Sequence, residues 1–227
     1  MKVLKLALVA AAASFAMAGA ASAQDVSFNI GVTSDYVFRG VSQTMEDPAV
    51  FGGVDFSSGM FYAGAWASNV DFGDDTQAEV DLYAGVKPAL GPIALDLGAV
   101  YYGYVGDDGD WATWELKAAA SVPAGPVTLG TAVFWSPDAT GVGTDENLYY
   151  EGNASFSPHE KVTVNLAVGK QTTDLTAGGE FEYTTANAGF AIAVTDIIGV
   201  DLRYHTSDID ACNLCGDRIA ATVKATF

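Results

Sequence analysis

The amino-acid sequence predicts an all-β fold, a transmembrane antiparallel up-and-down β-barrel of about twelve strands. Three observations predict it. Apolar and polar residues alternate with a period of two through most of the chain, as in strands with two unlike faces. The mean hydropathy is +0.22 although the formal net charge is −18 at pH 7. Short turns that contain Pro or Gly alternate with longer acidic loops.

A membrane barrel reconciles the apolar composition with the negative charge. Apolar side chains would face lipid, and the 28 acidic residues would lie in loops and in a wet lumen. The alternative, a soluble β-sandwich, needs half of the alternating faces to meet in a core. Nucleic acid is excluded as a partner because its phosphates would be repelled at this charge. We expect no cofactor, no metal site and no enzymatic activity.

The first 23 residues have the pattern of a secretory signal peptide. Lys2 and Lys5 precede an apolar run from 6 to 18, and Ala21-Ser22-Ala23 is a small-residue cleavage site. The run is shorter than the roughly 20 residues that a spanning helix needs. We therefore expect a signal peptide over 1–23, a barrel over 24–227 and export to the Gram-negative cell outer membrane.

The segments nearest the amino terminus alternate regularly. Residues 26–40 predict the first strand, and a loop over 42–47 follows. Residues 49–56 and 61–70 predict the next two strands, separated by a tight Ser57-Ser58-Gly59 turn.

The fourth predicted strand, 78–86, has the clearest pattern, because Glu79, Asp81 and Lys87 alternate with apolar residues. The same reading places the remaining strands at 93–101, 112–121, 127–135, 148–156, 162–168, 181–194, 200–205 and 217–227.

The last segment predicts how the barrel closes. Arg218 and Lys224 fall on one face, and an apolar face ends at the aromatic Phe227. We expect this strand to pair with the first one and to be read by the barrel-assembly machinery, with outer-membrane lipid as the surrounding partner. Aromatic residues would form two girdles. One comprises Phe28, Phe56, Phe61, Phe156, Phe190 and Phe227, and the other comprises Tyr36, Phe38, Tyr101, Trp111, Trp135, Tyr150 and Tyr204.

Three sequence blocks carry a family resemblance. The run from Gly31 to Thr44, GVTSDYVFRGVSQT, resembles the opening motif of the TorF-type porin family, proteobacterial conserved hypothetical outer-membrane proteins. The blocks 48–53 and 61–72 look like the next two motifs of that family, although Phe51 stands where the family pattern has Gln. The resemblance covers about residues 29–86 and implies an outer-membrane porin. It implies little about the solute.

Strand parity predicts which charged side chains line the lumen. The expected pore-lining residues are Asp35, Arg39, Asp55, Glu79, Asp81, Asp96, Glu115, Lys117, Glu151, Glu182, Asp201, Arg203, Arg218 and Lys224. The acidic excess predicts a channel for small solutes or ions that favours cations. We expect Arg39, opposed by Asp35 and nearby acids, to form the constriction. We also expect Arg218 and Lys224 to lie near Asp35 and Arg39 once the chain ends meet.

The outer loops suggest a second function. They repeat acidic residues, namely Asp71, Asp74, Asp75, Asp107, Asp108, Asp110, Asp145, Glu146, Asp208 and Asp210. Such a rim attracts cations. The alternative to a channel is therefore a closed barrel whose acidic outer loops serve binding or adhesion.

Two short motifs remain. Cys212 and Cys215 lie on the expected oxidising side of the membrane, which predicts a disulfide that pins the last loop. His205-Thr206-Ser207 resembles the His-x-Ser of outer-membrane lipid hydrolases. His205 shares its parity with Asp201 and Arg203, so it would face the lumen rather than the membrane.

Overall fold

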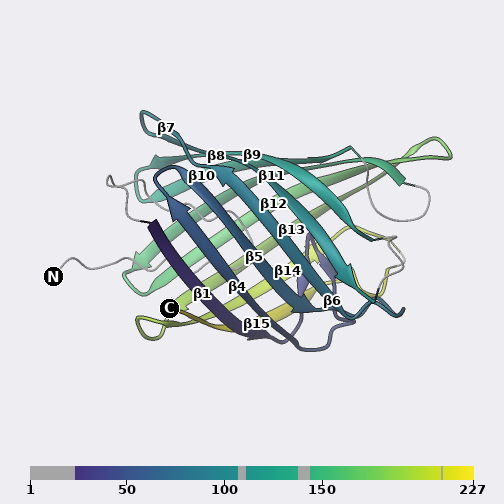
Figure 1. The fold of residues 1–227 in the computed structure, drawn as a ribbon, viewed down its shortest axis with the longest axis horizontal. Coiled ribbons are helices and arrows are strands. Elements are labelled where there is room, and N and C mark those ends of the chain that lie inside the picture. The colour runs from purple at the N-terminus through teal and green to yellow at the C-terminus, as the bar shows by residue number, and fades with distance from the viewer. Residues whose placement is uncertain (1–23, 107–110, 138–143, 211) are drawn as a thin grey trace.

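The computed structural model describes residues 24–106, 111–137, 144–210 and 212–227. The expected signal peptide over 1–23 and the acidic loop residues 107, 108 and 110 lie outside the described residues. In the described part, twelve long strands form one barrel wall (Figure 1). They are β1 (Gln24–Thr33), β4 (Ala49–Ser58), β5 (Phe61–Asn69), β6 (Ala78–Val86), β8 (Ile93–Val105), β9 (Thr113–Ala124), β10 (Val127–Ser136), β11 (Thr144–His159), β12 (Val162–Leu175), β13 (Glu180–Ala193), β14 (Ile198–Ser207) and β15 (Arg218–Thr226).

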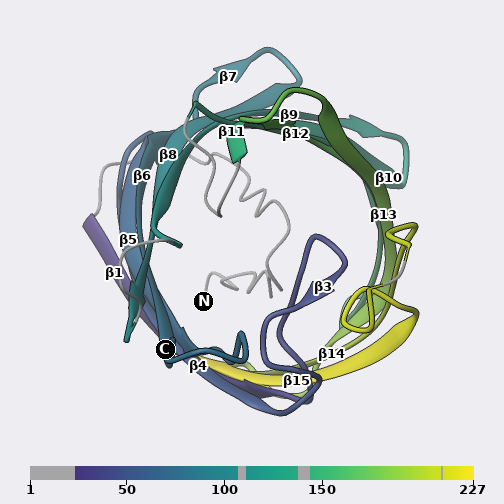
Figure 2. The same ribbon diagram turned by 90° about the vertical axis from the view of Figure 1, so that its right-hand side faces the viewer.

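The barrel is an antiparallel meander closed between its first and last strands. β1 pairs with β15 from Asn29↔Thr226 to Thr33↔Thr222, and β6 pairs with β8. Phe28 and Phe227 extend the seam by exchanging two backbone hydrogen bonds of 2.7 and 3.0 Å. Figure 2 shows the resulting ring of strands from the long-loop end. The predicted fold, an up-and-down barrel of about twelve strands closed by its last strand, is confirmed.

The two faces of the wall differ in the way that the alternation predicts. On the outer face the side chains of Leu82 and Val168 are each 55% exposed. On the inner face Glu79 and Asp96 are each only 3% exposed, because they are packed inside the barrel. An apolar outside and a polar inside are typical of a barrel that spans a membrane.

Among the described residues, no helix is both long enough and apolar enough to cross a membrane.

The first strand ends earlier than predicted, and this is the main correction to the strand assignment. β1 stops at Thr33, and the chain then forms two short strands, β2 (Val37–Phe38) and β3 (Val41–Ser42), that pair with each other. The turn between them has positive φ at Arg39 (45°) and at Gly40 (84°). This left-handed conformation cannot continue a strand, and glycine adopts it at less steric cost than other residues. The prediction of a strand over 26–40 is therefore wrong after Thr33.

Other strand ends differ by smaller amounts. β11 and β12 extend beyond the predicted ranges, and β13 begins one residue earlier than predicted, so β12 and β13 are joined by a short turn with positive φ at Gly178 (84°) and Gly179 (106°). β9 continues through Pro123, which faces Thr128 near the end of the strand. A missing backbone donor is tolerated at a strand end. A further two-residue strand, β7 (Ala89–Leu90), lies in the turn before β8.

The outer face yields a first prediction. Leu82 lies at the centre of β6 and points outward. We expect Leu82→Arg to lower the free energy of unfolding from lipid vesicles by about 2–4 kcal/mol, because a cation near the bilayer midplane is desolvated. Urea titration of the folded barrel measures the change. Leu82→Ala serves as the control, and equal stability of the two variants would show that this face is not in lipid.

Candidate functional site

The candidate site is a hairpin that folds into the barrel. We call residues 34–48 the inner hairpin. Figure 2 shows β3 and the flanking turns within the ring of strands when the barrel is viewed from its end, and contacts with side chains on β6, β8 and β9 place them inside the barrel. Val37 pairs with Ser42 and Phe38 with Val41, and the Gln43 N–H donates to the Tyr36 carbonyl at 2.7 Å. Two strands of two residues each are not stable alone, so the hairpin depends on contacts with the barrel wall.

The base of the inner hairpin is fixed by Asp35. Its carboxylate is 7% exposed and accepts hydrogen bonds from Ser42 Oγ at 2.6 Å and from Thr44 Oγ1 at 3.3 Å. Arg218 Nη1 of β15 lies 3.0 Å from the same carboxylate, and its Nη2 lies 3.3 Å from Glu46. Arg218 therefore lies beside Asp35, as the expected closure of the barrel implied.

The tip of the inner hairpin is fixed by Arg39. Its two terminal nitrogens donate to the two carboxylate oxygens of Glu115 on β9, at 2.7 and 2.8 Å. A third hydrogen bond goes to Gln171 Oε1 at 3.3 Å. The guanidinium also lies over the rings of Tyr149 and Phe134, at 4.3 and 5.0 Å from their centroids. Paired hydrogen bonds of this kind are among the strongest in proteins, and stacking on rings adds to them.

The predicted opposition of Arg39 and Asp35 is wrong. Arg39 pairs with Glu115, whereas Asp35 pairs with Arg218. The prediction placed Arg39 and Asp35 on one strand, four residues apart and on the same face. Because the chain reverses at residues 39 and 40, the hairpin carries Arg39 away from Asp35.

Between its base and its tip, the inner hairpin contacts further parts of the wall. The Tyr36 hydroxyl donates to Glu79 on β6 at 2.6 Å, and the Phe38 ring lies 5.9 Å from that of Tyr102 on β8. Tyr36 and Phe38 therefore lie inside the barrel, and their assignment to an outer aromatic girdle is wrong. The girdle prediction assumed that β1 continues past residue 33.

Gly40 brings the tip against the opposite wall. A Cβ on this residue would lie 2.6 Å from Thr185 Oγ1 on β13 and 3.0 Å from Ser207 Cβ on β14. The backbone therefore approaches these strands as only glycine can. Together these contacts join the inner hairpin to β5, β6 and every strand from β8 to β15.

The last loop supports the inner hairpin from the long-loop end. Cys212 and Cys215 form a disulfide, and the Leu214 carbonyl within this small loop accepts the Ser42 N–H at 2.9 Å. The Ser207 hydroxyl donates to the Cys215 carbonyl at 2.6 Å. The disulfide loop is therefore tied both to β14 and to the hairpin.

Two further lumenal cations are held by acids. Lys117 lies 2.7 Å from Asp96, and Arg203 donates to both oxygens of Asp201 at 3.1 and 2.9 Å. Arg203 also donates to Asn187 at 2.6 Å. Lys224 lies on the inner face of β15, in phase with Arg218.

Tyrosine hydroxyls hold several of the lumenal acids, and sequence reasoning missed this pattern. Tyr83 donates to Asp55 at 2.6 Å, Tyr62 to Asp96 at 2.7 Å, Tyr102 to Glu115 at 3.1 Å and Tyr149 to Glu151 at 3.1 Å. The signal was present, because each of these tyrosines lies in phase with inward-facing residues of its own strand.

Asp81 has a different environment. It follows Glu79 on the inner face of β6, and one of its carboxylate oxygens is buried without a hydrogen-bond partner among the described residues. Such an oxygen is free to accept a hydrogen bond from a solute or from a hydrated ion.

One predicted pore-lining residue points the wrong way. Glu182 on β13 lies on the outer face, in phase with Phe190 (52% exposed) and Ile192 (40% exposed). It forms an ion pair of 2.5 Å with Lys170, and its side chain is 53% exposed. The prediction conflicted with the assignment of Phe190, which has the same parity on this strand, to an aromatic girdle.

The His-x-Ser motif also lies on the inner face. His205 and Ser207 share the phase of the buried Asp201 and Arg203, so both point away from the membrane. Because the Ser207 hydroxyl donates to a backbone carbonyl, its hydrogen is not directed at a histidine. Nucleophilic activation of serine needs that arrangement.

The fold and lumen define a closed, membrane-spanning barrel of the kind found in outer-membrane porins. The sequence matches the family described as "Bacterial protein of unknown function (Gcw_chp)" over residues 17–227, and the chain belongs to this family. No curated protein matches it.

Solved porins share the fold. The KdgM porin has a TM-score of 0.61 at 6% identity, with 88% of this chain and 99% of that chain covered. The NanC porin has a TM-score of 0.59 at 10% identity, with 89% and 99% covered. A loop-deletion form of OmpT from Vibrio cholerae has a TM-score of 0.53 at 8% identity, with 92% and 100% covered. At these identities the likeness concerns the fold.

The Arg39–Glu115 pair yields a second prediction. Glu115→Gln leaves the buried guanidinium without a counter-charge, which costs about 3–5 kcal/mol. We expect hydrogen exchange of the hairpin amides to accelerate by about a hundredfold or more, because the hairpin opens locally. Mass spectrometry of exchanged peptides over residues 34–48 measures this.

The double variant Arg39→Met/Glu115→Gln is the matched control, since it removes both charges. Its hairpin should exchange more slowly than that of the single variant. Wild-type exchange rates in Glu115→Gln would show that the pair does not hold the hairpin.

Proposed function

We propose that the protein is an outer-membrane channel for small solutes that favours cations over anions, with the inner hairpin as its constriction. The observation that carries this proposal is a set of lumenal acids that form no ion pair among the described residues. We call Glu79 and Asp81, the two members on β6, the acid wall. Glu79 and Asp81 on β6 face the lumen, and neither forms an ion pair among the described residues. Glu151 on β11 is likewise held by Tyr149 and Asn153 rather than by a cation.

The distribution of lumenal charge supports a preference for cations. Arg39, Lys117, Arg203 and Arg218 each lie within ion-pair distance of one acid at least. Their positive charges are therefore largely offset, whereas Glu79, Asp81 and Glu151 form no ion pair with a cation among the described residues. Low-dielectric walls around like charges raise the local concentration of the opposite ion.

The position of the inner hairpin supports a limit to small solutes. Barrels of about eight strands are filled by side chains, whereas those of 16–18 strands hold an open aqueous channel. A barrel of twelve strands lies between these sizes, and here the hairpin occupies part of its lumen. The passage must therefore run between the hairpin and the wall.

Comparison with known porins supports the channel and also suggests what it excludes. The resemblance to the TorF-type porin family, which rests on residues 31–72, agrees with a channel. One solved structure of the same fold is a KdgM porin in complex with oligogalacturonate, an anionic sugar chain. The uncompensated acids of this lumen would oppose such a solute.

The alternative is a closed barrel whose acidic outer loops bind a partner or mediate adhesion. The closed barrel is favoured by the contacts of the inner hairpin, which reach every strand from β8 to β15. Conduction separates the two proposals.

Single-channel recording in planar bilayers across a salt gradient tests the channel. We expect discrete current steps with a cation-selective reversal potential. Arg39→Ala should increase both the conductance and the cation preference, since it frees the hairpin tip and removes a positive charge. Unchanged conductance and selectivity in this variant would show that Arg39 does not form the constriction. If the protein passes no current although its heat-dependent gel mobility shows that it is folded, the closed barrel is favoured.

The acid wall yields a separate prediction. Glu79→Gln/Asp81→Asn should shift the reversal potential toward that of a non-selective channel, because two uncompensated charges leave the lumen. The shift should shrink at high salt, where charges are screened. Glu182→Gln is the matched control, since that acid lies on the outer face. An equal shift of the reversal potential in both variants would mean that selectivity reflects the net charge of the protein rather than the lumenal acids Glu79 and Asp81.

A further inference from the structure

Two glycines lie on the inner face of the wall, at positions where a strand would normally carry a side chain. Gly64 lies in the middle of β5, and Gly85 lies near the short-turn end of β6. A glycine inside a strand weakens the strand, because it packs no side chain and loses more conformational freedom on folding. Such a glycine often marks a place where another group approaches the backbone closely.

At both glycines a tyrosine occupies the space that a side chain would take. A Cβ built on Gly64 would lie 2.5 Å from Cε2, Cζ and the hydroxyl oxygen of Tyr83, which belongs to β6. A Cβ built on Gly85 would lie 2.5 Å from the hydroxyl oxygen of Tyr62, which belongs to β5. Each tyrosine therefore lies against the backbone of the strand beside its own.

The hydroxyl groups show how far each tyrosine extends along the wall. Tyr83 on β6 donates to Asp55 on β4 at 2.6 Å, and Tyr62 on β5 donates to Asp96 on β8 at 2.7 Å. In the order of the sheet, one strand lies between each donor and its acceptor. Because adjacent strands are about 4.8 Å apart, each side chain must cross the intervening strand to reach its acid. Gly64 and Gly85 lie at these two crossings.

The crossing tyrosines border water in the lumen, close to the strands that hold the inner hairpin. Tyr62 and Tyr83 are both partly exposed although their hydroxyls are hydrogen-bonded. Tyr83 lies opposite Val100 on β8, and Val100 lies opposite Glu115 on β9, which holds the hairpin tip. Tyr83 is thus two strands from the anchor of the tip, in the same row of the sheet.

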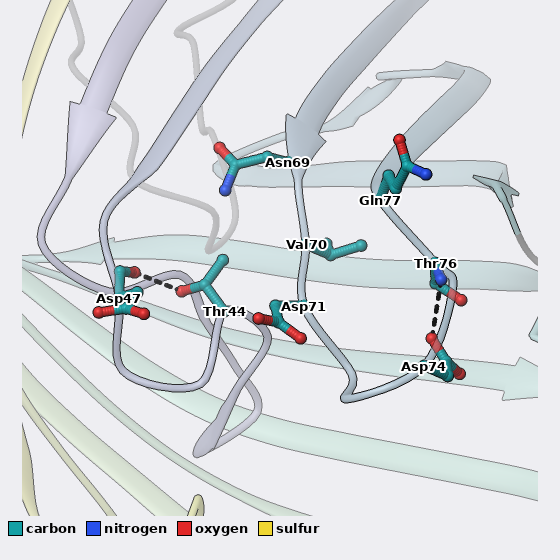
Figure 3. Close-up of a pocket in the computed structure, with 8 residues that line it drawn as sticks. All are labelled: Thr44, Asp47, Asn69, Val70, Asp71, Asp74, Thr76 and Gln77. Carbon is teal, nitrogen blue, oxygen red and sulfur yellow. Dashed lines mark hydrogen bonds between the residues drawn. The ribbon is translucent and has the colours of Figure 1, made fainter.

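The wall formed by β5 and β6 is also joined to the inner hairpin at the long-loop end. Thr44 of the hairpin bridges to Asp71 in the loop between these strands, residues 70–77 (Figure 3). The Asp71 N–H donates to the Gln43 carbonyl at 2.9 Å. Because this join fixes the wall relative to the hairpin, the space left between them depends on how the side chains of the wall lie.

We propose that Gly64 and Gly85 are specificity-determining residues, which keep the lumen wide by letting Tyr83 and Tyr62 lie against the wall. This role rests on the proposed function, because the width of the lumen matters only if solutes pass through it. A side chain at position 64 would take the place of the Tyr83 ring. The ring would then lose its hydrogen bond to Asp55 and turn into the lumen, where it would exclude larger solutes.

Gly64 gives the sharper test, because the three atoms nearest to its added Cβ all belong to Tyr83, whereas Gly85 also faces the Leu97 carbonyl. In planar bilayers, the single-channel conductance of Gly64→Ala should fall to roughly half that of the wild type or less, since the displaced ring narrows the lumen. The double variant Gly64→Ala/Tyr83→Ala should recover at least the wild-type conductance, because the displaced ring is absent. Tyr83→Ala alone should exceed the wild type.

Gly152→Ala is the matched control. Gly152 is exposed on the outer face of β11, and no atom of the described residues lies within 4 Å of a Cβ built on it. The same substitution there should leave the conductance unchanged. Tyr83→Phe keeps the ring over Gly64 and removes only the hydrogen bond, so it should alter the conductance less than Gly64→Ala does.

Heat-dependent gel mobility shows whether each variant is folded. Wild-type conductance in folded Gly64→Ala, or a double variant that conducts no better than Gly64→Ala, would overturn the role of Gly64. If Gly64→Ala does not fold, Tyr83→Ala decides, and unchanged conductance in that variant would overturn the proposal.

Failure of this proposal differs from failure of the channel. Cation-selective current that does not respond to these substitutions would keep the channel and remove the role of the two glycines. A folded wild-type barrel that passes no current would remove both.

Discussion

The structure depends on one constraint, the hydrogen-bonded seam between the first and last strands. A sheet in lipid must satisfy every backbone donor and acceptor, so it has to close. The seam pairs β1 with β15 and continues through Phe28 and Phe227. It also places Arg218 of β15 directly beside the point where the chain leaves β1. The base of the inner hairpin is therefore anchored by the same closure that completes the barrel.

Inside the barrel, buried charges rather than apolar contacts determine the position of the hairpin. Arg39 and Asp35 are both largely buried, and each is matched by an opposite charge from a distant strand. Buried charges are tolerated only when they are paired and hydrogen-bonded, so these partners leave few alternative positions for the hairpin. The inner hairpin thus has specific attachment points at its base and at its tip, whereas a hairpin packed only by apolar side chains could shift along the barrel wall.

The period of two in the sequence was sufficient to predict the barrel, its closure and most of the lumenal face. It could not predict the inner hairpin, because residues 31–38 alternate like a strand and only the turn at Gly40 interrupts them. Nor could it pair Arg39 with Glu115, which lies 76 residues away in sequence. Glu182 shows the remaining weakness, since assigning the parity of a strand one residue out of phase places a side chain on the wrong face of the sheet.

The base of the inner hairpin and the lumenal acids of β6 are linked through single side chains. Thr44 accepts the Tyr36 N–H at 3.2 Å, and the Tyr36 hydroxyl donates to Glu79 at 2.6 Å. The tip of the same hairpin is held by Glu115 on β9 through Arg39. In the proposed channel, the element that narrows the lumen is therefore bonded directly to acids that line it, so that the width of the passage and its charge would depend on one rigid element.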